Sequence, residues 1–135
     1  MKKILIVDDE TDFCFFVKKN LEIAGDFQVS TCSDSSAALD RIKDLRPDLI
    51  LMDFMMPGMT GVDVAEQLKK SPFTEKIPIV FLTSMATGEE TGKRRNLVGG
   101  QCMLAKPVQI DELLRVIDTL IGVEEKEPEP EEEEP

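Results

Sequence analysis

The sequence lacks an apolar run long enough to cross a membrane. Its longest runs, such as Ile4–Val7, have the length of a β-strand, whereas a helix that spans a bilayer needs about 20 apolar residues. No signal-peptide pattern comes before these runs. We therefore expect no membrane insertion, and we expect a soluble protein in the cytoplasm.

The sequence also has no histidine, and its only cysteines are Cys14, Cys32 and Cys102. Their number is odd and their spacing differs from that of a metal site. We therefore interpret them as small buried apolar side chains in a reducing compartment, and we assign them no chemistry.

Clusters of basic residues are scarce. Only Lys93-Arg94-Arg95 approaches the kind of cluster that releases counterions from a nucleic-acid backbone. The formal net charge is −11, and residues 123–135, with eight Glu and one Lys, carry −7 of it, which leaves −4 for residues 1–122. We therefore expect no direct binding to nucleic acid.

Strand-like apolar runs alternate along the chain with segments whose apolar residues recur at helical spacing. The strand-like runs end at Val7, Met52 and Leu82. The helical stripes are Phe13, Phe16, Val17 and Leu21; Ala38, Ile42 and Leu45; Val64, Ala65 and Leu68; and Ile110, Leu113, Leu114, Ile117 and Ile121. Such alternation predicts a parallel sheet that is covered by helices on both faces.

The burial pattern of each strand indicates its place in the sheet. Leu49–Met52 and Ile79–Leu82 are continuous apolar runs, as expected for strands buried on both faces, whereas Phe27–Thr31 alternates and belongs at an edge. We predict an α/β fold, a doubly wound five-stranded parallel sheet of order 2-1-3-4-5 with five helices, in which ligands bind at the carboxyl ends of the strands. The glycine-rich segment 86–100 is expected to form only a short, mobile helix.

The chain has the size of a single domain. It has 135 residues, of which 41% are hydrophobic, and we assign residues 1–122 to this domain. Residues 123–135 are dominated by Glu and Pro, which cannot bury enough apolar surface to offset the entropy lost on ordering. We predict that this acidic tail is disordered.

Five polar residues directly follow predicted strands. Asp8 and Asp9 follow the first strand, Asp53 the third, Thr83 the fourth, and Lys106 comes just after the short fifth strand. Each alone is explained as a turn, cap or surface residue, but together they place five polar side chains at one edge of the sheet. Three converging carboxylates repel one another unless a cation compensates, and oxygen ligands without histidine or thiolate suit Mg²⁺. Lys106 and the Thr83 hydroxyl would then contact a phosphoryl group.

These residues lie in segments that resemble the signature of a response-regulator receiver domain. The resemblance runs in the right order from residue 1 to about residue 122. The matching segments are Ile4–Glu10 (ILIVDDE), Asp48–Asp53 (DLILMD), Met56-Pro57-Gly58, Gly61, Leu82-Thr83-Ser84 and Lys106-Pro107.

The resemblance implies a flavodoxin-like fold in which Asp53 attacks a phosphohistidine and forms an acyl phosphate. Asp9, Asp53 and the backbone carbonyl of Met55 would bind Mg²⁺, with Asp8 acting partly through water. Because the chain has no histidine, the donor must be a separate histidine kinase or histidine phosphotransfer protein.

The resemblance also assigns roles to the ends of the last two strands. Thr83 would follow the phosphoryl group and shift the loop after its strand, while Lys106 would pair with a phosphoryl oxygen. The peptide bond before Pro107 is expected to be cis.

Three methionines depart from the family pattern. Met103 stands where relatives usually carry an aromatic residue that moves on phosphorylation, so we expect no aromatic switch, and a packing role explains Met103 at least as well as a signalling role. Met55 and Met85 stand where polar side chains help to position the attacking water, so we expect slow autodephosphorylation unless these positions only face solvent. We expect the output to be a downstream effector protein bound near Met103 and the final helix.

Three alternatives differ in class from a phosphorylation switch. A receiver fold could act as an interaction scaffold without phosphorylation, which the absent aromatic residue allows but the complete set of acidic residues and lysine disfavours. A Mg²⁺-dependent phosphohydrolase would also use an aspartate nucleophile, but the sequence has no Asp-x-Asp pattern after a strand and no cap insertion. A nucleotide-binding protein is disfavoured, because no G-x-x-x-x-G-K-[ST] or G-x-G-x-x-G motif follows a strand. We therefore predict a binding switch and not an enzyme that releases a product.

Overall fold

The computed structural model of the chain describes residues 1–54, 60–83, 96–98 and 101–122. The elements within these residues are, in chain order, β1 (Lys2–Val7), α1 (Thr11–Ala24), β2 (Phe27–Cys32), the 3₁₀ helix η1 (Ser35–Ala37), α2 (Ala38–Leu45), β3 (Leu49–Asp53), α3 (Gly61–Leu68), β4 (Ile79–Thr83), β5 (Asn96–Val98), β6 (Gln101–Ala105) and α5 (Ile110–Ile121). None of the helices among them is long and apolar enough to cross a membrane.

The sheet has the predicted parallel core. Its strand order is β2-β1-β3-β4-β6-β5, and the first five of these strands are parallel, so the predicted order 2-1-3-4-5 is confirmed with β6 as the fifth strand. β2 lies at the edge, as its alternating burial predicts, because its sequence buries Phe27 and Val29 and exposes Gln28. The strand order brings the carboxyl ends of β1, β3, β4 and β6 to one edge of the sheet.

The strand β5 corrects one prediction. Residues 96–98, within the segment for which we expected a short helix, pair antiparallel with β6, and Val98 lies opposite Gln101. Only Gly99 and Gly100 connect the two strands, and a two-residue glycine connection between apolar segments is typical of a β-hairpin. The structure describes four of the five predicted helices, and the rest of the segment for the fourth lies outside the described residues.

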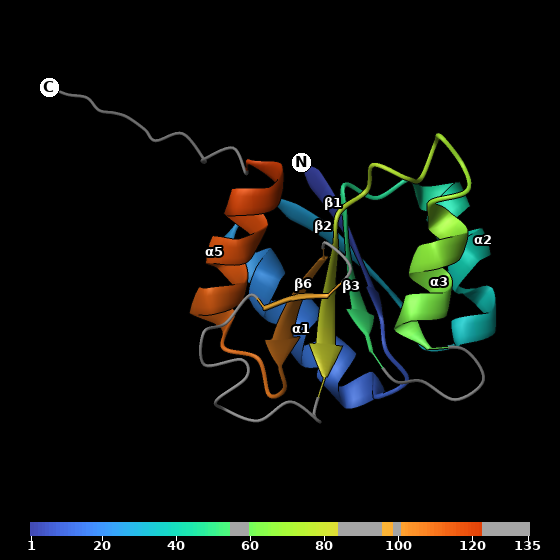
Figure 1. Cartoon of the computed structure of the whole chain (residues 1–135). Helices are drawn as coiled ribbons and strands as arrows, with labels where there is room; N and C mark the ends of the chain where they lie inside the picture. The colour runs from blue at the N-terminus through green and yellow to red at the C-terminus, as the bar shows by residue number, and fades with distance from the viewer. Residues whose placement is uncertain (55–59, 84–95, 99–100, 123–135) are drawn as a thin grey trace, which may run out of the picture.

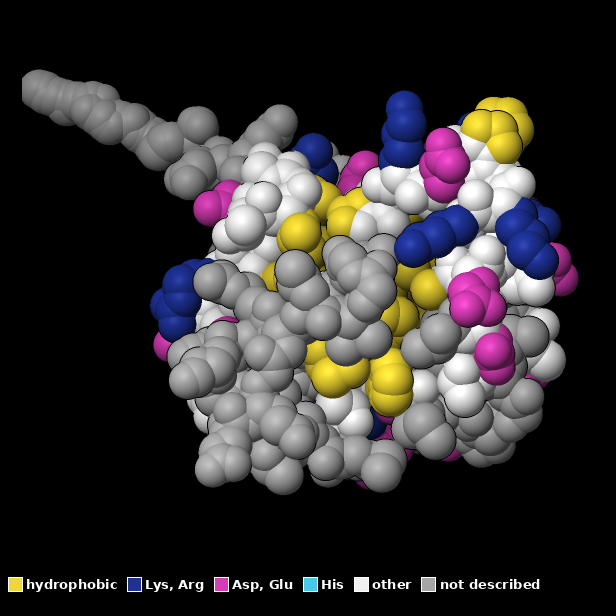
Figure 2. Space-filling model, viewed as in Figure 1, with side chains coloured by type: hydrophobic (Ala, Val, Ile, Leu, Met, Phe, Trp, Pro, Cys, Tyr) yellow, Lys and Arg dark blue, Asp and Glu magenta, His cyan; other side chains and the backbone are white. Residues whose placement is uncertain are grey.

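Helices cover both faces of the sheet, and two separate clusters of buried side chains form the core (Figure 1). Ile4, Ile6 and Leu51 point toward α1 and α5, whereas Leu5 and Ile50 point toward α2 and α3. Successive residues of each strand thus alternate between the two clusters, as the pleat of a strand requires. On the face seen in Figure 2, charged side chains of both signs lie over the helices and hydrophobic side chains gather between them.

The buried stripe of α1 differs from the predicted one at Phe16. The helix buries Cys14, Val17 and Leu21, and Phe16 is 49% exposed. Cys14 takes the inward position because residues 14, 17 and 21 follow helical spacing, which turns Phe16 away from the sheet. Phe13 is partly buried and packs beside this cluster.

The central strand should dominate the stability of the fold. We expect Leu51→Ala to lower the free energy of unfolding by about 2–5 kcal/mol, because Leu51 is fully buried and its loss leaves a cavity. Ile23→Ala, at an exposed position of α1, is the matched control and should change this free energy by no more than about 0.5 kcal/mol. Urea unfolding of both variants measures the difference, and equal losses would contradict this description of the core.

Candidate functional site

Three carboxylates meet at the carboxyl edge of the sheet. β1 and β3 are neighbouring parallel strands in which Val7 lies opposite Met52, so Asp8 follows one strand beside Asp53 at the end of the other. Asp8, Asp9 and Asp53 offer carboxylate oxygens that all lie within 4.8 Å of one another. Asp8 is fully buried, Asp53 is 7% exposed, and Asp9 is exposed. The structure thus brings together the three acidic residues that the sequence predicted.

Asp8 is fixed by several hydrogen bonds. Its backbone N–H donates to the carbonyl of Cys32 at 3.0 Å, and its Oδ1 accepts from the N–H of Glu10 at 2.9 Å. The Cys14 thiol donates to the Asp8 carbonyl at 3.3 Å. Burial, with a contribution from the charge of Asp8, raises the pKa of Cys14 to about 12, so this thiol stays protonated. The surroundings therefore hold the Asp8 carboxylate in one orientation.

Lys106 carries the positive charge that faces these carboxylates. Its backbone N–H donates to the Thr83 carbonyl at 2.9 Å, which sets its position at the end of β6. Its Nζ lies 2.9 Å from Asp8 Oδ2 and 3.8 Å from Asp53 Oδ2, and its side chain is 9% exposed. The peptide bond between Lys106 and Pro107 is cis, as the sequence predicted.

Two further residues hold Lys106 and were missed from the sequence. Glu10 Oε1 lies 2.8 Å from Nζ, and the Phe13 ring centroid lies 4.7 Å from it. Glu10 ends the Ile4–Glu10 segment that resembles the family signature, but no role for it was predicted from the sequence, and Phe13 was interpreted as core alone. Cation–π contacts of this kind add to the attraction of an ammonium group.

The pKa of Lys106 reflects opposing effects. Burial alone would lower it, but the contacts with the carboxylates of Glu10 and Asp8 and the charge of Asp53 together raise it above its ordinary value. A lysine whose pKa is raised in the folded state stays protonated through neutral pH. Lys106 is therefore a permanent cation in this site.

Thr83 lies between the acidic residues and the lysine in the sheet. β4 is the neighbour of both β3 and β6, with Leu82 opposite Asp53 and Thr83 opposite Ala105. Thr83 is buried at the carboxyl end of its strand. Asp53 and Thr83 are therefore the last residues of β3 and β4. Asp8 and Asp9 follow the end of β1, and Lys106 follows the end of β6, at the same edge of the sheet.

Of the three methionines that depart from the family pattern, only Met103 lies in the part of the chain that the structure describes. Met103 on β6 is partly buried and packs against the cluster beneath α2 and α3, so the structure supports its interpretation as a packing residue. Met55, whose carbonyl is a predicted metal ligand, and Met85 lie outside the described residues.

The geometry fits a hard divalent cation. Asp8 Oδ2 is buried and meets Lys106 as an ion pair without a well-directed hydrogen bond, which leaves it able to bind another cation. Among the described residues, the carboxylates of Asp8, Glu10 and Asp53 surround the ammonium group of Lys106, and the Asp9 carboxylate lies beside those of Asp8 and Asp53. An oxygen-only donor set with excess negative charge suits Mg²⁺. Asp8, Asp9 and Asp53 are the described side chains that would hold it.

Comparisons with known proteins agree with this geometry. The family model described as the response regulator receiver domain matches residues 4–118. The phosphate regulon transcriptional regulatory proteins PhoB of Rhizobium meliloti and Pseudomonas aeruginosa are 34% and 40% identical to the chain, over 90% and 84% of it but only 52% and 48% of their own lengths. The chain thus spans about half the length of these curated relatives.

Solved structures of similar size share the fold. A response regulator from Desulfuromonas acetoxidans superposes with a TM-score of 0.75 at 28% identity, covering 88% of this chain and 95% of that one. The Vibrio cholerae chemotaxis protein CheY4 gives a TM-score of 0.75 at 31% identity, covering 89% and 98%. The similarity therefore extends over nearly the whole of these two chains.

The pairing of Lys106 with Asp8 can be tested by stability. We expect Lys106→Met to lower the free energy of unfolding by about 3 kcal/mol without divalent cations, because Asp8 stays buried beside Asp53 without its partner. Asp8→Asn in the same chain should restore part of that loss. Urea unfolding of the single and double variants measures the coupling.

Lys18→Met is the matched control for this cycle. Lys18 pairs with Glu22 on the surface of α1, where such a pair contributes only about 0–1 kcal/mol. A loss for Lys106→Met no larger than that of the control, or no recovery in the double variant, would contradict the proposed compensation of charge.

Proposed function

Because the chain belongs to the response regulator receiver domain family, we propose that it is a phosphorylation switch in which Asp53 accepts a phosphoryl group from a phosphohistidine. The observation that carries this proposal is the position of the Asp53 carboxylate. It ends a central strand, lies among the carboxylates of Asp8 and Asp9, and is 3.8 Å from the Lys106 ammonium. The family generally accepts phosphoryl groups and does not act as a catalytic enzyme, and its acidic triad is typical of a Mg²⁺ site.

In the proposed transfer, the protein contributes mainly electrostatic stabilisation of the phosphoryl group. One oxygen of the Asp53 carboxylate attacks phosphorus, the bond between phosphorus and the histidine nitrogen breaks, and an acyl phosphate forms while the leaving imidazole keeps the electron pair and takes up a proton. Lys106, already 3.8 Å from Asp53 and permanently charged, would bind one phosphoryl oxygen. Thr83, at the end of the next strand, would donate its hydroxyl to another.

Bound Mg²⁺ would supply positive charge that neutralises the phosphoryl oxygens during transfer. On the protein side, Asp8 and Asp9 would hold the ion together with Asp53, and the Met55 carbonyl is proposed as a further ligand. The buried Asp8, fixed by the N–H of Glu10, would orient this set. The excess of carboxylates over ammonium groups supports the need for the ion.

Membership of the family implies a histidine kinase as partner. Since the chain has no histidine, the phosphohistidine is proposed to lie on that kinase or on a phosphotransfer protein, and both would meet the switch in the cytoplasm. We propose that a downstream effector protein reads the phosphorylated state, without direct contact between this domain and nucleic acid. The surface around Met103 and α5 is the proposed output face, because β6 links Met103 directly to Lys106.

The acceptor can be tested by intact mass after incubation with acetyl phosphate. We expect the native chain to gain one phosphoryl group in the presence of Mg²⁺ and none when the metal is chelated. Asp53→Asn should abolish the gain, since the amide is a poor nucleophile, and Asp40→Asn, at an exposed position of α2, should keep it. Equal gains in the native chain and Asp53→Asn would show that another residue is the acceptor. No gain in either protein would favour the phosphorylation-independent scaffold.

The lifetime of the acyl phosphate tests the expectation about Met55 and Met85. Neither thioether can activate water, so we expect slow loss of the phosphoryl group. The Met55→Asn, Met85→Glu double variant should lose it faster, by up to about 100-fold, because polar groups could then position the attacking water. Phosphoryl loss followed by mass after removal of the donor measures both rates, and equal lifetimes would refute this role for the two positions.

A further inference from the structure

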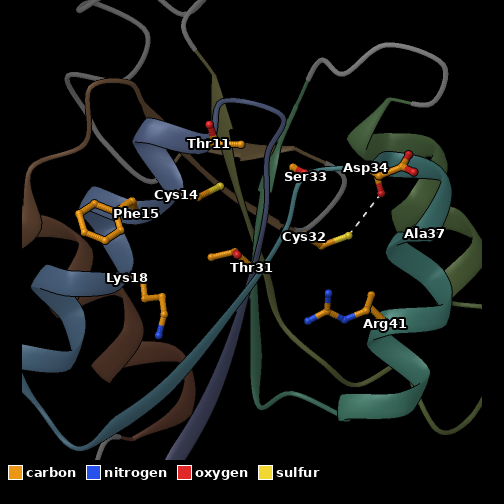
Figure 3. Close-up of a pocket in the computed structure, with 10 residues that line it drawn as sticks. All are labelled: Thr11, Cys14, Phe15, Lys18, Thr31, Cys32, Ser33, Asp34, Ala37 and Arg41. Carbon is orange, nitrogen blue, oxygen red and sulfur yellow. Dashed lines mark hydrogen bonds between the residues drawn. The ribbon is translucent and has the colours of Figure 1, made fainter.

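A groove of about 470 Å³ lies between α1 and α2, over the carboxyl half of the edge strand β2 (Figure 3). Phe15 and Lys18 line it from α1, Thr31 and Ser33 from the end of β2, and Arg41 from α2. Its size is in the range of cavities that hold ligands of about 300–1,000 Å³. The phosphoryl chemistry proposed above uses none of these residues.

The floor of this groove contains an open strand edge. β2 pairs with β1 on one side, and no other described strand pairs with it. The Asp26 carbonyl accepts a hydrogen bond from the N–H of Lys2 in β1, and the Cys32 carbonyl accepts one from the N–H of Asp8, which follows β1. The backbone N–H and carbonyl groups of even-numbered residues of β2 therefore point toward β1, and those of odd-numbered residues point outward. Val29 confirms this alternation, because its N–H donates outward to the Glu22 carboxylate at 3.3 Å. The next outward residue, Thr31, presents its backbone to the groove.

Two cations face the groove from opposite walls. Lys18 and Arg41 both extend into the space beside Thr31 in Figure 3. The Lys18 ammonium lies 2.9 Å from Glu22 at a half-exposed position, whereas Arg41 has no ion pair among the described residues. Asp34 is the single acid among the lining residues, and its Oδ1 accepts from the N–H and hydroxyl of Ser36. The groove therefore suits an extended peptide that carries carboxylates.

Residues 123–135 of this chain have that composition. They include Glu127-Pro128-Glu129-Pro130-Glu131, in which every second residue is proline. Proline has no N–H and is tolerated in a strand only where its nitrogen faces away from the neighbouring strand. If Glu127, Glu129 and Glu131 turn their backbone toward β2, both prolines fall on the outer side. The alternation thus permits pairing along one edge only.

We infer that the acidic segment 123–135 docks in the groove of the same molecule, adding an extended segment to β2 beside Thr31 with its carboxylates near Lys18 and Arg41. The segment follows α5 directly, and α5 packs beside α1, which forms one wall of the groove. Packed helices lie about 8–10 Å apart. Because α5 ends at the amino edge of the sheet (Figure 1), the path also runs about 16 Å along β2 to Thr31, while the nine residues from Val123 to Glu131 extend about 30 Å. The segment is therefore long enough to pass over α1 to β2.

A weak intrinsic affinity is sufficient for this contact. A segment on a short flexible linker has an effective concentration of about 1 mM, so an interaction with a dissociation constant near that value would be about half formed. The docked segment would cover the ring of Phe15, which is 66% exposed. It would thereby reduce the apolar surface that α1 offers to other proteins.

Amide hydrogen exchange of the full chain, measured residue by residue by NMR, tests the inference. We expect the Thr31 N–H to be protected at low salt and to exchange at least several-fold faster in Glu127→Gln, Glu129→Gln, Glu131→Gln and in high salt. Arg41→Gln should have the same effect, whereas Lys70→Gln, at an exposed cation after α3, should not. The Ser30 N–H, which faces β1, is the internal control and should stay protected throughout.

Two results would overturn the inference. Equal exchange of Thr31 in the native chain and in the triple glutamine variant would show that the segment does not occupy the edge of β2. Protection that increases with protein concentration would show that the occupant is the segment of another copy and not of the same molecule.

Discussion

Repulsion between Asp8 and Asp53 is the constraint on which the site depends. Both carboxylates are buried at the ends of neighbouring strands, where low polarity strengthens the repulsion between like charges. Lys106 is placed against them by the pairing of β4 with β6 and by its own N–H bond to the Thr83 carbonyl. One ammonium group compensates only part of this charge, so the site retains an attraction for a divalent cation.

The parallel sheet explains why these positions could be predicted from the sequence. In a doubly wound sheet the carboxyl ends of the strands share one edge, so the first polar residue after each apolar run falls in one place. The lengths of the apolar runs thus determined the positions of Asp8, Asp53 and Thr83, and the edge location of β2 followed from its alternation. The family resemblance added the cis bond before Pro107, which no run of apolar residues predicts.

The remaining features depend on contacts between distant segments. Glu10 and Phe13 hold Lys106, which lies more than ninety residues away, and helical spacing alone gave Phe13 only a place in the core. Phe16 was assigned to the buried stripe because a helix pattern does not reveal which of two adjacent apolar faces meets the sheet. The strand Asn96–Val98 needs β6 as its partner, so the local glycine content indicated a weak helix where pairing favours a hairpin.

The contacts of Lys106 provide a physical basis for the proposed switch. Its ammonium now lies 2.8 Å from Glu10, whose side chain is 62% exposed, and 3.8 Å from the buried Asp53. A salt bridge to an exposed carboxylate contributes little, because water competes for both charges. A phosphoryl group on Asp53 would add negative charge on the buried side of Lys106. The ammonium group would then move from Glu10 toward Asp53 at a small cost in free energy. Because Lys106 is bonded through its backbone to Thr83 of β4 and directly follows β6, such a shift would act on the end of β4 at Thr83 and on β6, which carries Met103.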